Sequence, residues 1–379
     1  MDFRLPIYGL CDSGRGFWLR LDADAKDVGL KPSRIFPAFY CLKNEEGKPI
    51  AVMTTHVDDL LYAYLPEGEP TMTRLLSKFE VGTAEVGVFR YCGKQFTQAD
   101  DFSVTIDVID NTRRIGKIRI DEGRKPGDKV TKGELTQLRS AIGSLAWIAR
   151  QARPDLLYKV SYLQTTVKAA TVSTLKECNR VIDIAKNSMN EVKLRFIPGI
   201  LDWQNCGVLT VTDASFSNEP GYKSQQGRSH FFVNTCDLKD DFSSVFNVMP
   251  ISFSSITMKR VCRSTLQAEA YALQSGIESG DRLRALLAET NGKFERLNDW
   301  ELLTRQSTPQ LLLSDCRSLV EHLNAEIPAK IADKRLGIEM MSIRQSLWTE
   351  DTLQRTWLEY PEGGDFLVWI STGTTSPSL

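Results

Sequence analysis

The sequence predicts a mixed α/β (α+β) protein built from three parts. Strand-like and helix-like apolar patterns alternate along the chain. The segment after residue 206 has three strands, a helix, a strand and further helices in that order, which is typical of a mixed sheet with flanking helices. The chain has 379 residues, of which 42% are hydrophobic and 25% charged. This length and composition allow two or three packed domains and exclude a disordered or fibrous protein.

The first part, residues 1–120, is predicted to mix helices with short strands. Apolar residues recur at helical spacing from Phe17, and the turn signal at residues 44–47 separates two extended runs, which predicts a hairpin. The expected elements are helices at 17–28 and 71–79 and strands at 38–42, 50–55, 60–64, 89–96, 103–108 and 116–120.

The second part, residues 121–200, is predicted to be helical and basic. A polar stretch with glycine and proline at 121–132 marks its start, and the helical pattern over 134–193 is interrupted only at Pro154. This part has 14 basic and 8 acidic residues, whereas the whole chain has 47 and 48. The near-neutral total therefore conceals a basic segment.

The third part, residues 201–379, has 17 basic and 23 acidic residues and a changed pattern. Ser264 is a suitable N-cap for a long helix at about 265–289. The other expected elements are strands at 208–216, 227–234, 248–255, 310–314 and 356–360 and helices at 318–323 and 329–347.

Two adjacent acids, Asp58 and Asp59, lie in the run HVDDLL between two predicted strands. One interpretation is a solvated turn. The other is a divalent-metal site, because hard cations prefer clustered carboxylate oxygens. Neighbouring side chains in extended chain point in opposite directions, so a metal site here requires a third carboxylate from elsewhere.

Three acids of the third part are candidates for a second metal site. Asp213 lies in a predicted strand, Glu269 in the long helix, and Asp315 at the end of the strand 310–314. Each has an ordinary alternative: a turn or cap, an exposed helix position and a helix N-cap. Acids at the ends of adjacent strands can nevertheless converge with one from a crossing helix. Such a cluster can hold Mg²⁺ for phosphodiester cleavage.

Distinctive runs of residues extend over nearly the whole chain. They are IYGL (7–10) with GRGFW (14–18), HVDDLLYA (56–63), FRYCG (89–93), LRSAIGSLAWIARQARPDLLYKVSYL (138–163), TDASF (212–216), STLQAEAYAL (264–273) and LLLSDCRSL (311–319). In content and order they resemble the C-terminal part of a copia-type retrotransposon polyprotein. Two positions depart from the family pattern: His56 replaces a tyrosine and Cys92 a leucine.

The resemblance implies a truncated reverse transcriptase palm over 1–120, a connection over 121–200 and a ribonuclease H-like domain over 201–379. It implies that Asp58 and Asp59 belong to a polymerase metal site. It also implies that Asp213, Glu269 and Asp315 are the first three metal-binding carboxylates of a nuclease that hydrolyses RNA in RNA–DNA hybrids.

Two family acids have no counterpart in this sequence. The first polymerase acid lies upstream of the IYGL run in the family, and the fourth nuclease acid falls near Ser378 here. We therefore expect a weakly active or inactive chain with a weak or partial Mg²⁺ site. The alternatives are a non-catalytic nucleic-acid-binding protein derived from a retrotransposon, and a truncated chain that aggregates.

Basic residues are candidates for contacts with the phosphates of an RNA–DNA hybrid or another nucleic acid. The alternative is that they are solvated, or that Arg153 pairs with Asp155. The candidates are Arg139, Arg150, Arg153, Lys159, Lys259 and Arg260.

The sequence has features that are typical of an intracellular protein. No run approaches the ~18 apolar residues of a membrane span, and the N-terminus has no signal-peptide pattern. The eight cysteines form no CxxC pair, which is typical of reduced thiols. We expect a cytoplasmic or nuclear protein with no membrane partner.

Overall fold

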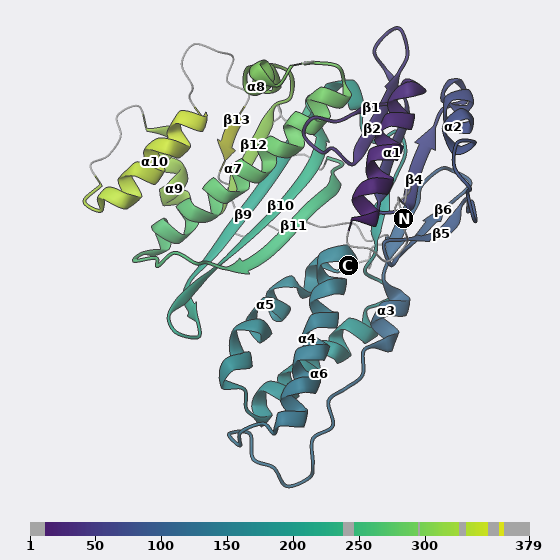
Figure 1. Cartoon of the computed structure of the whole chain (residues 1–379). Helices are drawn as coiled ribbons and strands as arrows, with labels where there is room; N and C mark the ends of the chain where they lie inside the picture. The colour runs from purple at the N-terminus through teal and green to yellow at the C-terminus, as the bar shows by residue number, and fades with distance from the viewer. Residues whose placement is uncertain (1–11, 238–245, 295, 326–330, 348–355, 360–379) are drawn as a thin grey trace, which may run out of the picture. The chain divides into compact units, whose positions relative to one another are not determined.

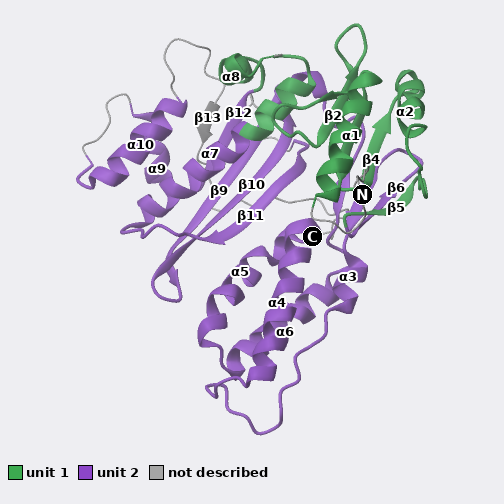
Figure 2. Cartoon of the chain, in the orientation of Figure 1, with its two compact units in different colours: residues 1–92, 282–308 green, residues 93–281, 309–379 purple. Residues whose placement is uncertain are grey.

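The computed structural model describes residues 12–237, 246–294, 296–325, 331–347 and 356–359 (Figure 1). The chain divides into two compact units (Figure 2). Unit 1 comprises residues 1–92 and 282–308, and unit 2 comprises residues 93–281 and 309–379. The three-part division expected at residues 120 and 200 stays a prediction.

Unit 1 contains a four-stranded antiparallel sheet in the order β1-β2-β3-β4. Leu21 and Ala25 on α1 are fully buried and pack in one cluster with Tyr40, Met53 and Leu75. This apolar face positions α1 on the sheet. The elements up to residue 92 are α1 (Ser13–Asp27), β1 (Lys31–Pro32), β2 (Phe39–Lys43), β3 (Pro49–His56), β4 (Asp59–Tyr64), α2 (Glu69–Leu76) and β5 (Val88–Tyr91).

The second segment of unit 1 contains the end of α7 (Thr265–Thr290) and all of α8 (Trp300–Ser307). The carboxylate of Glu289 accepts hydrogen bonds from the Ser33 hydroxyl and from the Arg34 amide, and Lys43 donates to its carbonyl. These bonds attach the 282–308 segment to the loop between β1 and β2.

The first half of unit 2 is mainly a helical bundle. A capping box of Thr131 and Glu134 starts α4, and the run stops before Pro154 because proline cannot continue a helix. Fully buried Leu138, Leu145 and Leu175 contribute to one apolar core. The elements are β6 (Lys94–Gln98), β7 (Val104–Asp107), α3 (Ile109–Arg114), α4 (Lys132–Ala152), α5 (Leu157–Thr166), α6 (Val172–Asn187) and β8 (Leu194–Phe196).

Two predicted strands are wrong in detail. The run 89–96 is divided between β5 and β6, because Cys92 (φ 48°) and Gly93 (φ 77°) turn the backbone. The segment 116–120 is not a strand. The Ile118 amide donates to the Asn179 side chain (2.8 Å), and the Ile118 carbonyl accepts from it (2.9 Å). Asn179 thus takes the place of a partner strand.

The second half of unit 2 is a five-stranded mixed sheet in the order β11-β10-β9-β12-β13. The first three strands in the chain are antiparallel, whereas β12 pairs in parallel with both β9 and β13. The mixed sheet with its flanking helices is the arrangement that the sequence predicted for this part of the chain. The elements are β9 (Cys206–Glu219), β10 (Lys223–Asn234), β11 (Met249–Thr257), α7, β12 (Gln310–Ser314), α9 (Arg317–Asn324), α10 (Lys334–Leu347) and β13 (Thr356–Glu359).

One face of this sheet packs against helices α7, α9 and α10 (Figure 1). Leu273 of α7, Leu312 of β12 and Ile343 of α10 are fully buried in the same cluster. Together with the sheets of both units, this arrangement confirms the predicted α/β class. Among the described residues, no helix is both long and apolar enough to cross a bilayer.

Candidate metal centre

The fold brings together three acids that are far apart in sequence. Asp213 lies on β9, and Asp315 directly follows β12. Because Ser314 is in register with Thr212 across the parallel pair, the next residue on each strand is an acid. Glu269 comes from α7, which crosses the same face. One carboxylate oxygen from each of the three residues lies within 4.8 Å of the others.

Glu269 is the buried member of this cluster, whereas Asp213 and Asp315 face solvent. Its side chain is 4% exposed, and its Oε1 accepts a hydrogen bond of 3.2 Å from the Ala214 amide. Burial, and then the charges of Asp213 and Asp315, raise the pKa of Glu269 to about 8. Burial and the charge of Asp315 also raise the pKa of Asp213. The three carboxylates therefore repel one another when all are ionised.

The donor set fits a hard divalent cation. The three acids offer the carboxylate oxygens that such cations prefer. The Oε2 atom of Glu269 is buried and has no hydrogen-bond partner among the described residues. A buried oxygen without a partner is costly, and a cation would both ligate it and relieve the repulsion.

The Asp58–Asp59 pair has a different environment. It lies at the β3–β4 hairpin, where the last residue of β3, His56, is in register with the first residue of β4, Asp59. Val57 and Asp58 form the two-residue turn. Both acids are exposed. Within the described part of the chain, the only cluster of three or more potential metal ligands is the one at Asp213. The third carboxylate that a metal site at this pair requires is thus not found among the described residues. The IYGL run lies outside the described residues.

Five of the six candidate basic residues are exposed or half-buried. Arg139 and Arg150 are exposed on α4, Lys159 is half-buried on α5, and Lys259 is exposed after β11. Arg260 is exposed but pairs with Glu339, and its guanidinium lies 5.0 Å from the centre of the Tyr271 ring.

Arg153 is 1% exposed and is enclosed in the protein. Its guanidinium pairs with Asp155 (2.7 Å) and donates to the carbonyl of Ala185 (2.8 Å) and the hydroxyl of Ser188 (2.7 Å). Of the two interpretations given for Arg153, the structure has the pair with Asp155, and the guanidinium is not available to a phosphate.

Sequence reasoning missed a cavity of about 480 Å³ between α3 and α4. Arg114, Ser140, Gly143 and Trp147 contribute to its lining. Ser140 follows Arg139 on α4, so the cavity adjoins one of the candidate cations. The signal in the sequence was the row of small residues Ser140, Gly143 and Ser144 on one side of a predicted helix.

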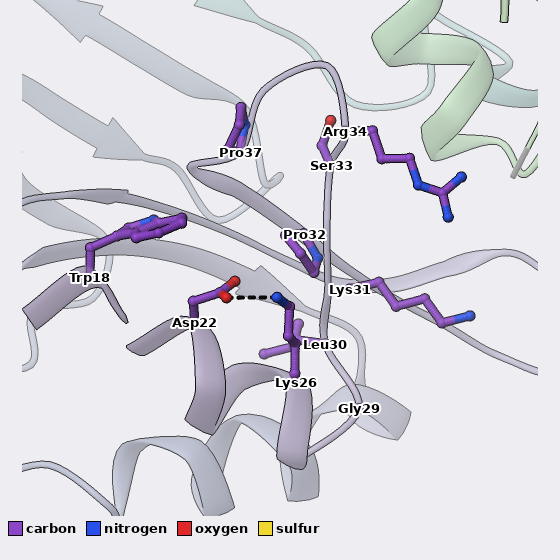
Figure 3. Close-up of a pocket in the computed structure, with 10 residues that line it drawn as sticks. All are labelled: Trp18, Asp22, Lys26, Gly29, Leu30, Lys31, Pro32, Ser33, Arg34 and Pro37. Atoms are coloured by element: carbon purple, nitrogen blue, oxygen red, sulfur yellow. Dashed lines mark hydrogen bonds and ion pairs between the residues drawn. The ribbon is translucent and has the colours of Figure 1, made fainter. Parts of the chain in front are cut away.

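Unit 1 has a cavity of about 520 Å³ beside α1 (Figure 3). Trp18, Pro32 and Pro37 line it, as do Asp22 and Lys26, which form an ion pair (2.6 Å). None of the predicted site residues lines this cavity.

No family model matches the chain. The truncated transposon Ty1-A Gag-Pol polyprotein of Saccharomyces cerevisiae is 21% identical over 216 residues, 57% of this chain and 16% of the relative. The transposon Ty1-LR2 Gag-Pol polyprotein of the same yeast is also 21% identical over 216 residues, which are 57% of this chain and 11% of that relative.

The chain is similar in sequence to the Gag-Pol polyproteins of Ty1 retrotransposons, which agrees with the copia-type resemblance predicted from its motifs. It spans only 11–16% of the length of these Ty1 relatives.

Solved structures give more distant likenesses. The foamy viral protease-reverse transcriptase in complex with an RNA/DNA hybrid is 12% identical, with 98% of this chain and 41% of that chain covered and a TM-score of 0.48. Ribonuclease H1 from the archaeon Halobacterium salinarum is 15% identical, with 40% of this chain and 81% of that chain covered and a TM-score of 0.23.

Proposed function

We propose that this retrotransposon relative hydrolyses the RNA strand of RNA–DNA hybrids, slowly, at the centre formed by Asp213, Glu269 and Asp315, with Mg²⁺ as cofactor. The observation that carries the proposal is the convergence of three carboxylates around a buried, unpartnered Glu269 oxygen. Carboxylates on two neighbouring parallel strands and on a crossing helix are suited to holding a cation against a phosphodiester.

The protein residues have separate tasks in this proposal. Asp213 and Asp315, which face solvent, would hold the cation on the side that a substrate can reach. The carboxylate of Glu269 is held in place by the hydrogen bond that the Ala214 amide donates to it, and it would complete the donor set. A bound Mg²⁺ supplies charge neutralisation at the scissile phosphate and lowers the pKa of a ligated water.

We propose that the hydrolysis is slow because the donor set is incomplete. The position near Ser378, where the family has a fourth acid, has a neutral hydroxyl and lies outside the described residues. A polymerase function at Asp58 and Asp59 is not proposed, because no third carboxylate joins them within the described ranges.

Contacts with the sugar-phosphate backbone are proposed for the exposed cations. Arg139 and Arg150 on α4 are both exposed and, within the described residues, neither forms an ion pair. Their attraction for phosphates would be independent of sequence and would weaken as salt rises. Lys159, Lys259 and Arg260 are proposed as further contacts.

The exposed cations of α4 also favour a second candidate, a retrotransposon-derived protein that binds nucleic acid without cleaving it. Binding of a hybrid with steep salt dependence and no cleavage would support this candidate and contradict hydrolysis.

The deciding experiment incubates the purified chain with an end-labelled RNA–DNA hybrid in Mg²⁺, with an all-DNA duplex of the same sequence as a control. We expect slow cleavage of the RNA strand alone, abolished by EDTA, by Asp213→Asn and by Glu269→Gln. Glu278→Gln is the matched control, because Glu278 is an exposed acid on the same helix. Cleavage that survives Asp213→Asn, or no cleavage by the unaltered chain, would refute the proposal.

A further inference from the structure

Two glycines of α7 lie on the same face as Glu269. Gly276 and Gly280 follow Glu269 by seven and eleven residues, which is about two and three turns of an α-helix. Both are buried, as is Glu269. A glycine inside a helix destabilises it by roughly 0.5–1 kcal/mol relative to alanine, so a buried pair invites a packing explanation.

The space beside these glycines is closed. A Cβ atom on Gly276 would lie 2.6 Å from Cγ2 of Thr212 and 3.1 Å from Cγ2 of Thr210. A Cβ atom on Gly280 would lie 2.1 Å from Nε2 of Gln310. Favourable carbon contacts need about 3.5–4.0 Å, so even alanine at position 276 would have to push α7 roughly 1 Å away from β9.

The side chains that pack against Gly276 and Gly280 have little room to move. Thr210 and Thr212 are β-branched, and they are 0% and 2% exposed. Gln310 is 0% exposed and donates to the Thr210 hydroxyl (2.8 Å). The contact surface of β9 and β12 under α7 is therefore stiff.

Hydrogen bonds also join α7 to the sheet beside Gly276. The His230 ring on β10 bonds through Nε2 to the carbonyl of Gly276 (3.1 Å). Because a carbonyl only accepts, Nε2 carries the proton. Burial lowers the pKa of His230, which keeps the ring neutral. Arg228 of β10 donates to the Ser275 hydroxyl (2.6 Å). These bonds fix α7 along the sheet as well as above it.

We propose that Gly276, supported by Gly280, is a positioning residue for the metal centre. Because Gly276 has no side chain, α7 can pack directly on β9. The distance between α7 and β9 in turn sets the distance of the Glu269 carboxylate from those of Asp213 and Asp315. Thr212, the residue against Gly276, directly precedes Asp213. A push at this contact therefore moves α7 away from the strand that bears Asp213. Ligand geometry tolerates displacements of only about 0.5 Å.

The expected effect of this packing on Mg²⁺ binding rests on the proposed function. The effect on the position of Glu269 does not, and it can be measured separately. The Ala214 amide bonds Glu269, so its proton signal reports the position of Glu269 in the metal-free chain. The experiment compares ¹⁵N-alanine-labelled Gly276→Ala with the unaltered chain. Gly337→Ala is the matched control, because Gly337 is a helical glycine whose Cβ would meet nothing closer than 4.0 Å.

We expect Gly276→Ala to shift the Ala214 amide signal and to weaken Mg²⁺ binding, measured by calorimetry, at least tenfold. Gly337→Ala should change neither. Thr212→Ser removes the methyl group that a Cβ at position 276 would meet. The double variant should therefore recover part of both effects, which a general loss of stability would not explain.

The outcomes separate the two proposals. If the unaltered chain binds no Mg²⁺ and cleaves no hybrid, the proposed function fails, while the Ala214 signal still tests the positioning role. An unchanged Ala214 signal in Gly276→Ala overturns the inference. A Gly276→Ala chain that unfolds and is not restored by Thr212→Ser also overturns it, because the damage would then not arise at this contact.

Discussion

The Asp58–Asp59 hairpin and the Asp213 cluster are both acid-bearing sites on sheets, yet they differ in what surrounds them. The hairpin acids are adjacent in sequence, exposed and joined by no third carboxylate in the described ranges. The cluster acids are distant in sequence, and one of them is almost fully buried. Asp58 lies in a turn and Asp59 begins the next strand, whereas Asp213 and Asp315 each follow a residue that is in register across a parallel strand pair. Proximity in space, not in sequence, distinguishes a candidate metal site from a polar turn.

Neutralising the acids of each site in turn should have the largest effect. Asp213→Asn is expected to weaken Mg²⁺ binding and hybrid cleavage by more than roughly 100-fold, because it removes a direct ligand and even indirect supports cost 10–100-fold. Asp58→Asn and Asp59→Asn together should change neither quantity. Calorimetric titration and cleavage rates measure both. Equal losses at the two sites would erase the distinction drawn between them.

A second comparison separates buried from exposed cations. Arg153→Ala is expected to lower the free energy of unfolding by about 3 kcal/mol, because it leaves Asp155 and two internal acceptors without their donor. Arg150→Ala, an exposed site on α4, should change stability by less than about 0.5 kcal/mol and should weaken hybrid binding at low salt. Urea unfolding and binding titrations measure these effects. If Arg153→Ala kept its stability and lost only binding, Arg153 would be a phosphate contact after all.

The pH dependence of stability sharpens the contrast between buried and exposed acids. The folded-state pKa of Glu269 is raised to about 8, above its ordinary value of 4.5. Between these values the folded chain holds a proton that the unfolded chain has lost. Its contribution to stability is therefore complete below about pH 4.5 and is lost as the pH rises through 8. The slope is at most about 1.4 kcal/mol per pH unit for one proton.

The measurement is thermal unfolding in EDTA between pH 5 and 9, for the unaltered chain and Glu269→Gln. The glutamine variant should lose less stability over this range. Mg²⁺ competes with the proton, so its affinity should rise as the pH increases toward 8. Parallel pH profiles of the two chains would show that Glu269 does not titrate as described.

The smallest effect concerns the turn of the Asp58–Asp59 hairpin. Val57 has a φ of 58°, which a β-branched residue adopts with strain. Val57→Asn is expected to stabilise unit 1 by about 0.5–1 kcal/mol, because asparagine tolerates this conformation in two-residue hairpin turns. Val86→Asn is the control, since Val86 is an exposed valine (89%) without positive φ. Urea unfolding that ranks the two variants equally would contradict the strain.

Much of the fold was predictable from local pattern. The periodicity over 134–193 and its interruption at Pro154 predicted α4, α5 and α6, because helical spacing and proline act locally. The segment 116–120 failed because its extended pattern is satisfied by one side chain, Asn179, of a helix about 60 residues later. A bond of that kind leaves no periodic trace in the sequence.

The candidate site was predictable in its members but not in its properties. Asp213 was chosen from its place in a predicted strand, Glu269 from its place on a predicted helix and Asp315 from its place at a strand end. The raised pKa of Glu269 and its unpartnered oxygen arise from burial, which depends on what packs over a residue. Arg153 illustrates the same limit, because its charge suggested a surface contact and its neighbours made it internal.

The α/β class, the resemblance to copia-type polyproteins and the identity of the candidate acids can be predicted from the sequence alone, because they depend on local pattern and residue chemistry. The convergence of three of those acids, the enclosure of Arg153 and the contact of α7 with β9 at Gly276 become evident only in the folded chain. Each of these depends on distances between segments that are remote in the chain, and such distances are set by the packing of the whole sheet and its helices.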